Sequence, residues 1–192
     1  MALDNIELRT FIRNYRKQLS SDVVAQASSQ ISEKIMQLPE FLSAKKIAYY
    51  LSHENEINLS MVACRAQALN KSLYLPVLKD KNELLFYHID SNTRFEKNKW
   101  EIEEPIISEE LSVLPNTFDL ILMPLVAFDI QGNRLGRGVG CYDRCLAFTK
   151  KMSQNKKPVL MGVAYEFQKV DTIIPESWDV PMDYVVTEKS VY

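Results

Sequence analysis

Cysteine, histidine and glycine are all scarce in this 192-residue sequence. Of its three cysteines, Cys141 and Cys145 are separated by three residues, which matches neither a redox motif nor a zinc-ligand spacing. We therefore expect reduced cysteines that take part in packing. Neither His53 nor His88 has a metal-ligand partner at a useful spacing, so we assign them no catalytic role. The sequence therefore does not favour an enzyme that uses zinc, a redox disulfide or a catalytic histidine.

Long apolar runs and a strong net charge are also missing. No run approaches the roughly 20 residues of a membrane span, and the first residues lack the apolar centre of a signal peptide. The formal net charge is -2, with 25% charged and 46% hydrophobic residues, as is ordinary for a globular protein. We predict a cytoplasmic protein with no membrane or nucleic-acid partner, acting as a monomer and consisting of one domain, residues 1–192.

The hydrophobic pattern alternates between helical and strand periods. It predicts helices over 8–19, 21–38, 58–69 and 142–151, and strands over 46–51, 72–78, 83–89, 118–123, 158–164 and 184–187. Residues 79–82 fit a hairpin turn, and 90–116 a loop with at most short helical turns. We expect the large aromatic residues Tyr74, Phe86 and Trp100 in the core. The strand–helix–strand order predicts an α/β protein with a mostly parallel, mixed sheet.

The first predicted helix carries two stripes. Its apolar stripe consists of Leu8, Phe11, Ile12, Tyr15 and Leu19, and its cationic stripe of Arg9, Arg13, Arg16 and Lys17. The apolar positions recur at three- and four-residue spacing, as in an amphipathic helix that packs on a core. We expect the cationic stripe to be solvated, as such faces usually are.

One short segment concentrates the glycines. Four of the five lie between residues 132 and 140, in DIQGNRLGRGVGCYDRC (129–145), interleaved with Arg134, Arg137 and Arg144. Glycine lets backbone N–H groups approach a ligand, and arginine offers a planar fork for phosphate or carboxylate. The segment follows a predicted buried strand and leads into a helix, where α/β proteins bind anions. We interpret it as an anion-binding loop; the alternative is a tight glycine turn with solvent-exposed arginines.

The loop matches neither familiar nucleotide motif. Its G-x-G-x-G spacing lacks the third glycine of the dinucleotide fingerprint, and there is no G-x-x-x-x-G-K-[ST] sequence. The stretch PLVAFDIQGNRLGRGVGCYDR (124–144) instead resembles the signature of the 5-formyltetrahydrofolate cyclo-ligase family, also called methenyltetrahydrofolate synthetases. The resemblance includes LSHENEI (51–57), Leu75–Pro76 and ESWDVPMDYVVTE (176–188), so it covers nearly the whole chain.

The resemblance implies an enzyme with a three-layer α/β/α, Rossmann-like fold, related to the folds of phosphosugar isomerases and CoA transferases. Such enzymes use ATP as co-substrate, with Mg²⁺, to convert 5-formyltetrahydrofolate to 5,10-methenyltetrahydrofolate, releasing ADP and phosphate. Phosphoryl activation of the formyl oxygen followed by ring closure needs charge neutralisation and alignment more than a covalent nucleophile. Glycine N–H groups, arginines and a metal ion meet that need.

By the same resemblance, the site residues fall into groups. ATP contacts are expected from Arg9, Arg134, Leu135, Gly136, Arg137, Gly138, Val139, Gly140, Cys141 and Tyr142. Folate contacts are expected from Leu51, Glu56, Arg137, Gly138, Val139, Gly140 and Cys141. Arg137 and Asp143 are the expected catalytic residues, and Asp143 and Asp179 the expected Mg²⁺ ligands, because carboxylate oxygens suit this ion. Structural alternatives stay open: a solvated Arg9, a plain loop residue at Glu56, and a helix-dipole charge at Asp143.

Two positions depart from the family pattern. Members commonly have lysine where this chain has Asn5, and tyrosine where it has Cys141. The first change removes an expected phosphate contact, for which Arg9 or Arg13 could substitute; the second keeps the backbone N–H. Two other functions therefore stay in view: a folate-binding or buffering protein without turnover, and a phosphosugar isomerase or CoA transferase activity suggested by the fold alone.

Overall fold

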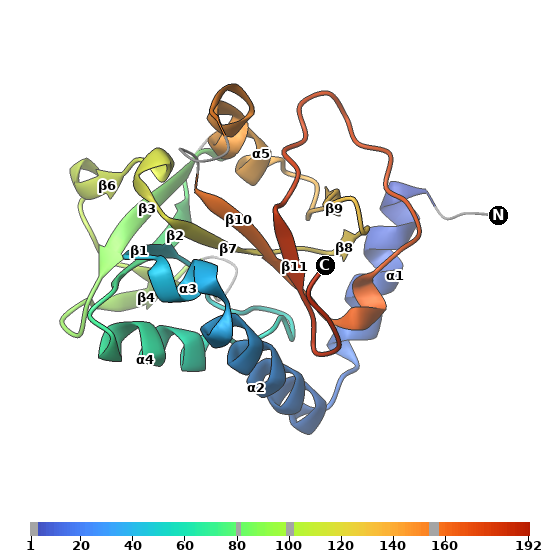
Figure 1. The fold of residues 1–192 in the computed structure, drawn as a ribbon, viewed down its shortest axis with the longest axis horizontal. Helices are drawn as coiled ribbons and strands as arrows, with labels where there is room; N and C mark the ends of the chain where they lie inside the picture. The colour runs from blue at the N-terminus through green and yellow to red at the C-terminus, as the bar shows by residue number, and fades with distance from the viewer. Residues whose placement is uncertain (1–3, 80–81, 99–101, 154–157) are drawn as a thin grey trace.

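The computed structural model describes residues 4–79, 82–98, 102–153 and 158–192. A seven-stranded sheet forms its centre (Figure 1). In spatial order its strands are β11 (Tyr184–Val186), β10 (Val159–Val163), β7 (Leu120–Pro124), β1 (Lys46–Ala48), β2 (Ser72–Leu78), β3 (Leu84–Ile89) and β6 (Ser112–Val113). Strands β11 through β2 are parallel, whereas β3 is antiparallel to both β2 and β6. The predicted mostly parallel, mixed sheet is confirmed.

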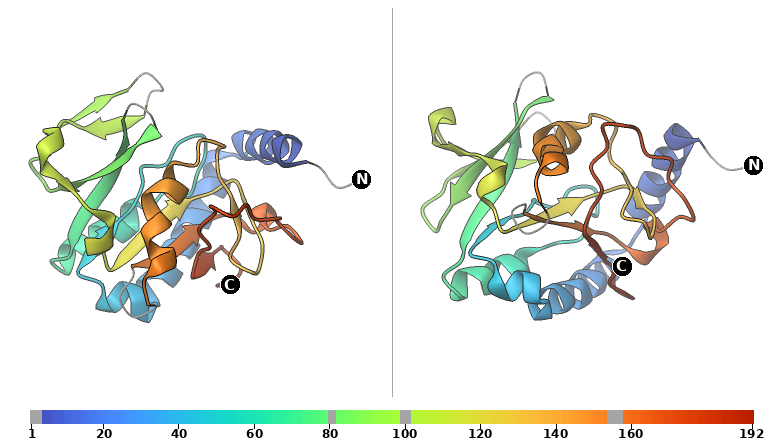
Figure 2. Two further views of the ribbon diagram at one scale, coloured as in Figure 1. Left: turned by 90° about the horizontal axis from the view of Figure 1, so that it is seen from above. Right: turned by 45° about the horizontal axis from the view of Figure 1, so that its top comes forward.

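Helices cover both faces of this sheet (Figures 1 and 2). On one face lie α2 (Ser21–Gln37), α3 (Pro39–Ser43) and α4 (Ser60–Ala68); on the other lies α5 (Cys141–Leu146), followed by the 3₁₀ helix Ala147–Lys151. Strand β7 serves both cores, because successive side chains of a strand point to opposite faces. Its residues Leu120 and Leu122 join one core cluster, and Ile121 and Met123 the other. The three-layer α/β/α arrangement is therefore as predicted.

Helix α1 (Asn5–Lys17) begins with a capping box between Asp4 and Glu7. It lies at one end of the molecule, next to β8 rather than on the sheet (Figure 1). Its orientation differs from the expectation: Phe11 is 61% exposed, whereas Arg16 is buried. The reason is that the inner face of α1 packs against polar turns as well as apolar residues. Within the described residues, no helix is both long and apolar enough to cross a bilayer.

The expectation of a loop over 90–116 was wrong for several short stretches. Strand β4 (Phe95–Lys97) pairs with β5 (Glu103–Pro105), and β6 extends the main sheet. Two 3₁₀ helices, Glu109–Leu111 and Pro115–Thr117, complete the region. Strands of two or three residues are too short to show alternation. Tyr74 and Phe86 are core residues as expected, whereas Trp100 lies outside the described residues, as do two residues of the predicted 79–82 turn.

The glycine segment divides into two parts with different roles. Strands β8 (Ala127–Phe128) and β9 (Arg134–Leu135) form a hairpin directly after β7. Gly132 lies in the hairpin turn with φ +85°, and a Cβ there would lie only 2.5 Å from the carbonyl oxygen of Met182. Gly132 is therefore needed for this turn. The anion-binding loop predicted above is reduced to 136–140, between β9 and α5.

Candidate active site

Helix α1 and the 136–140 loop meet through Arg9. Gly138 has φ +99° and Gly140 φ +66°, conformations that side-chain-bearing residues rarely adopt. The Arg9 Nε donates a hydrogen bond of 2.8 Å to the carbonyl oxygen of Gly136, and its Nη1 bonds the carbonyl oxygen of Asn5 at 3.3 Å. The first bond holds Arg9 at the loop and the second anchors its side chain to its own helix, so Arg9 is not simply a solvated cation.

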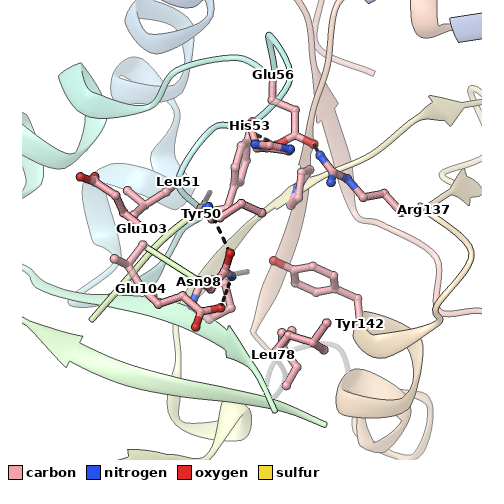
Figure 3. A pocket seen from close by; sticks show the side chains of 15 residues that line it. Tyr50, Leu51, His53, Glu56, Leu78, Asn98, Glu103, Glu104, Arg137 and Tyr142 are labelled. Carbon is pink, nitrogen blue, oxygen red and sulfur yellow. Dashed lines mark hydrogen bonds and ion pairs between the residues drawn. The ribbon is translucent and has the colours of Figure 1, made fainter. Parts of the chain in front are cut away.

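Arg137 extends from the loop toward Glu56 (Figure 3). Its Nη2 lies 2.9 Å from Glu56 Oε1, and the Nη2 of Arg16 lies 3.4 Å from the same oxygen. The other oxygen, Oε2, accepts a hydrogen bond of 3.1 Å from the backbone N–H of His53. Arg137 is 37% exposed and Glu56 only 7%. Glu56 is therefore a buried carboxylate shared by two arginines, not a plain loop residue.

The turn that carries Glu56 is held by the cationic stripe of α1. Glu54 and Asn55 both have positive φ, 51° and 56°. The Glu54 carboxylate lies 2.9 Å from Arg13 Nη2 and 2.9 Å from Lys17 Nζ. Burial raises the pKa of Glu54, but hydrogen bonds from Lys17 and Arg13 outweigh it and lower the pKa from 4.5 to about 2. Arg13 and Lys17 remain 36% and 50% exposed, so the expectation of a solvated cationic stripe is wrong only for Arg16, which is buried.

Arg16 is the most enclosed member of that stripe, with 1% of its side chain exposed. Its Nε donates to the carbonyl oxygen of Glu54 at 2.9 Å, and its Nη1 to that of Leu125 at 3.5 Å. Burial lowers the pKa of Arg16, the Glu56 carboxylate raises it, and Arg137 lowers it further. A guanidinium nevertheless stays charged in proteins. Arg16 therefore brings a fixed positive charge into the interior beside Glu56.

The other end of the loop contains a second ion pair. Arg134 Nη2 lies 2.6 Å from Asp143 Oδ1, and Arg134 Nη1 donates to the carbonyl oxygen of Val180. The backbone N–H of Val180 donates to the same Asp143 oxygen at 3.1 Å. These contacts bring Asp143 beside the residue that follows Asp179. Among the described residues, no group of three or more His, Cys, Asp or Glu side chains is placed to hold a metal.

Three cavities adjoin one another along the loop. The first, of about 200 Å³, lies between the 51–56 segment, β2, β3 and the β4–β5 hairpin (Figure 3). The second, of about 150 Å³, is lined by the loop and shares Glu56, Arg137 and Tyr142 with the first. The third, of about 630 Å³, shares Val139 and Asp143 with the second and is edged by lysines. The loop thus separates an apolar, carboxylate-containing cavity from a basic one.

Most predicted site residues line one of these three cavities; Arg9, Leu135 and Asp179 line none of them. Leu51 lines the first cavity, and Cys141 and Tyr142 the second. The side chain of Leu135 is buried in a core cluster with Ile12, so only its backbone faces the loop. Arg134 is engaged by Asp143, as described above. Which of these residues touch ligands stays a prediction.

The cysteines are free thiols, as expected. Burial raises the pKa of Cys141, and burial raises that of Cys145 to about 12. Protonated thiols are poor nucleophiles, so neither residue needs a catalytic role. Cys64 is exposed and therefore does not contribute to packing as expected.

Sequence reasoning missed the ionic cluster of Arg13, Arg16, Lys17 and Glu54, as well as the β4–β5 hairpin residues Asn98 and Glu104 that line the first cavity. A signal for the cluster was present. Arg9, Arg13 and Arg16 recur at spacings of four and three residues, the spacing of one helix face. Two glutamates follow the next predicted strand. Together with this regular cationic face, they could have indicated ion pairs between the helix and the segment after that strand.

The fold and the site define a Rossmann-like α/β protein with a glycine- and arginine-rich loop and a cavity next to the carboxyl end of a central strand. A family model described as the 5-formyltetrahydrofolate cyclo-ligase family matches residues 3–188. The chain belongs to this family, as the resemblance of its motifs implied.

Individual relatives agree with the family match. The chain is 38% identical to the 5-formyltetrahydrofolate cyclo-ligase of Haemophilus influenzae, with 92% of this chain and 93% of that one covered. It is 32% identical to the Escherichia coli K12 protein of the same name, covering 94% and 98%. The solved structure of Aquifex aeolicus 5,10-methenyltetrahydrofolate synthetase superimposes with a TM-score of 0.81 at 34% identity, covering 98% of this chain and 92% of that one.

Proposed function

We propose that this protein converts 5-formyltetrahydrofolate to 5,10-methenyltetrahydrofolate in a reaction that consumes ATP, requires Mg²⁺ and releases ADP and phosphate. The observation that carries the proposal is the position of Arg137. Its backbone belongs to the glycine loop, while its side chain reaches Glu56 between two cavities. A residue so placed can contact a phosphate and a folate together. The family match supports the same reaction.

The reaction requires that the folate and the phosphates of ATP bind next to each other. A formyl amide is a poor electrophile, so its oxygen must first become part of a good leaving group. Transfer of the γ-phosphoryl group of ATP to the formyl oxygen does this and releases ADP. The neighbouring folate nitrogen then attacks the activated carbon, the ring closes, and phosphate leaves. Aligned cations that stabilise phosphoryl charge are the main catalytic requirement, and Arg137 is placed to supply one.

The folate is assigned to the first two cavities. They are lined largely by apolar side chains, including Leu51, Leu78 and Pro124, which suits a flat heterocycle. Glu56 is the buried carboxylate that can accept hydrogen bonds from the N–H groups of the pterin. Glycine backbone at 138 and 140, with Val139 and Cys141 beside it, then faces the formyl group.

The triphosphate of ATP is assigned to the 136–140 loop and the third cavity. Arg144, Lys150 and Lys151 line this cavity, and Trp178, which is 63% exposed, forms part of its wall. Arg9 adds a cation from α1, which offsets the absence of a lysine at Asn5. The positive charges match a ligand with several negative ones.

The residues present fit Mg²⁺ when substrate phosphates complete its shell. Asp143 uses Oδ1 for Arg134 and Val180, and Asp179 uses Oδ2 to accept the backbone N–H of Glu176. Neither remaining oxygen has a hydrogen bond within the described part of the chain. Mg²⁺ commonly takes one or two protein carboxylates plus phosphates and water. When bound, it would neutralise phosphate charge, and Asp143 and Asp179 would hold it beside the loop.

Absorbance of the methenyl product gives the direct test. Purified protein is mixed with 5-formyltetrahydrofolate, ATP and Mg²⁺, and parallel samples omit ATP or Mg²⁺. We expect product only in the complete mixture, with ADP formed in equal amount. Folded protein that forms no product would contradict the proposal; tight folate binding without ADP release would identify a folate-buffering protein instead. Sugar-phosphate binding without folate binding would favour the isomerase-like alternative. The cytoplasmic location and monomeric state stay predictions from the sequence.

A further inference from the structure

Glu56 is bound by two guanidinium groups that differ in their freedom to move. Arg16 is 1% exposed, and its Nε and Nη1 donate to the carbonyl oxygens of Glu54 and Leu125. Arg137 is 37% exposed and belongs to the glycine loop. Both Nη2 atoms contact the same carboxylate oxygen, Oε1. One partner of Glu56 is therefore anchored, whereas the other can turn away.

This inference rests on the proposed reaction, which makes different demands on Arg137 and on Glu56. A phosphate at the loop attracts Arg137, and a pterin in the first cavity needs Glu56 as an acceptor. When Arg137 turns toward phosphate, Glu56 loses its shorter ion pair, 2.9 Å, while its side chain is still 7% exposed. A buried carboxylate without a cationic partner is strongly disfavoured and turns toward water. That movement would take away the acceptor that the pterin needs.

We propose that Arg16 is a positioning residue that keeps the Glu56 carboxylate directed at the folate cavity when Arg137 leaves it for phosphate. Arg16 does not line any of the three cavities along the loop, so it acts through Glu56. Its backbone supports the same turn, since the Asn55 side-chain amide donates to the carbonyl oxygen of Arg16 at 3.1 Å. Helix α1 thus contacts the 136–140 loop through Arg9 and the turn that carries Glu56 through Arg16.

The test compares folate affinity with and without a nucleotide. Binding of 5-formyltetrahydrofolate is measured by calorimetry for the wild type and Arg16→Gln, alone and with Mg²⁺ and a non-hydrolysable ATP analogue. We expect Arg16→Gln to weaken folate binding about threefold without the analogue and about 30-fold with it. With the analogue bound, Arg16 is the sole cation on Glu56 in the wild type, so its loss then has the larger effect. A purely structural defect would weaken both measurements by the same factor, and that outcome would overturn the inference.

Two further variants separate positioning from folding. Arg16→Lys keeps the charge, so it should restore most of the affinity in the analogue experiment. Lys17→Gln is the matched control: it lies on the same helix and contacts Glu54 but not Glu56. It should show no nucleotide-dependent loss. If Arg16→Lys binds folate no better than Arg16→Gln in the presence of the analogue, or if Lys17→Gln shows the same loss, the inference fails.

A double-mutant cycle covers the case in which Arg16→Gln does not fold. Glu56→Gln removes the buried charge that Arg16 serves, so the small loss of affinity that remains in Arg16→Lys should disappear in the Glu56→Gln background. Equal losses in both backgrounds would contradict a role through Glu56. Product formation by the wild type is recorded in the same preparation. If the wild type forms no methenyl product, the proposed function fails; if it forms product and the cycle is additive, only this inference fails.

Discussion

Two arginines at the glycine loop, one in β9 just before it and one within it, have opposite surroundings. Arg134 in β9 is 5% exposed and binds Asp143 and the Val180 carbonyl, so it links the start of the loop to the segment that carries Asp179. Arg137 within the loop is 37% exposed and shares Glu56 with Arg16. Three residues apart in the sequence, they have the same chemistry but different surroundings. One is fixed by its contacts, and the other is free enough to exchange partners.

We infer from this difference that a cation in an anion-binding motif can act by holding the loop in place. The backbone of a loop must be held in place before its N–H groups can converge on a ligand, and a buried arginine with a carboxylate partner does this. The exposed arginine is then left to meet the ligand. We therefore expect Arg134 to act mainly on stability and Arg137 mainly on turnover.

The largest expected effect concerns Arg137. Replacing it by alanine should lower turnover by about 100-fold, because a preorganised cation at the transferring phosphate is lost. The free energy of unfolding should change by less than about 1 kcal/mol, since the side chain is partly exposed and Glu56 keeps Arg16. Turnover is measured by methenyl absorbance and stability by urea unfolding. Arg65→Ala, an exposed arginine on α4, is the control and should change neither quantity. A stable protein with wild-type kinetics would remove the proposed role of Arg137.

Arg134→Met should affect the free energy of unfolding more than turnover. The variant keeps side-chain volume but leaves Asp143 without its cation, so we expect the free energy of unfolding to fall by about 2 kcal/mol. Urea unfolding with and without saturating Mg²⁺ measures this, and Mg²⁺ should recover part of the loss by compensating Asp143. If Arg134→Met were as stable as the wild type, the division of roles between Arg134 and Arg137 would not hold.

The proposed metal ligands Asp143 and Asp179 lie near Arg134. Asp179 can be tested without disturbing the Arg134–Asp143 ion pair. Asp179→Asn keeps an oxygen that can accept the Glu176 N–H but removes a negative charge. We expect about a tenfold increase in the Mg²⁺ concentration needed for half-maximal activity. Asp171→Asn, an exposed position earlier in the same segment, should leave the Mg²⁺ dependence unchanged. An unchanged Mg²⁺ requirement in Asp179→Asn would mean that Asp143 does not act with this partner.

The sequence was sufficient for six of the seven strands of the main sheet and for naming a candidate site, but not for the ionic contacts of that site. Buried strands such as β7 are continuous apolar runs, and the loop motif resembles a family signature, so both could be predicted. The β4–β5 hairpin could not, because its strands are too short for a periodic signal. Arg16 was misplaced because amphipathic patterning assumes that apolar residues mark the buried face. Helix α1 instead packs partly on a turn that supplies carboxylates, a contact between segments distant in sequence.

The smallest expected effect tests the carboxylates that face Arg137. The pKa of Glu54 is lowered from 4.5 to about 2 in the folded protein, so the folded state binds this proton more weakly than the unfolded chain does. Glu54 should therefore stabilise the fold fully above pH 4.5, and this contribution should be lost as the pH falls toward 2. Glu54→Gln removes the titrating group. The difference in unfolding free energy between wild type and Glu54→Gln, measured by urea at several pH values, should be largest near neutral pH and shrink on acidification. Because Arg13, Lys17 and Arg137 all lie near this carboxylate, a difference that stayed constant down to pH 2 would mean that they do not act on it as charges.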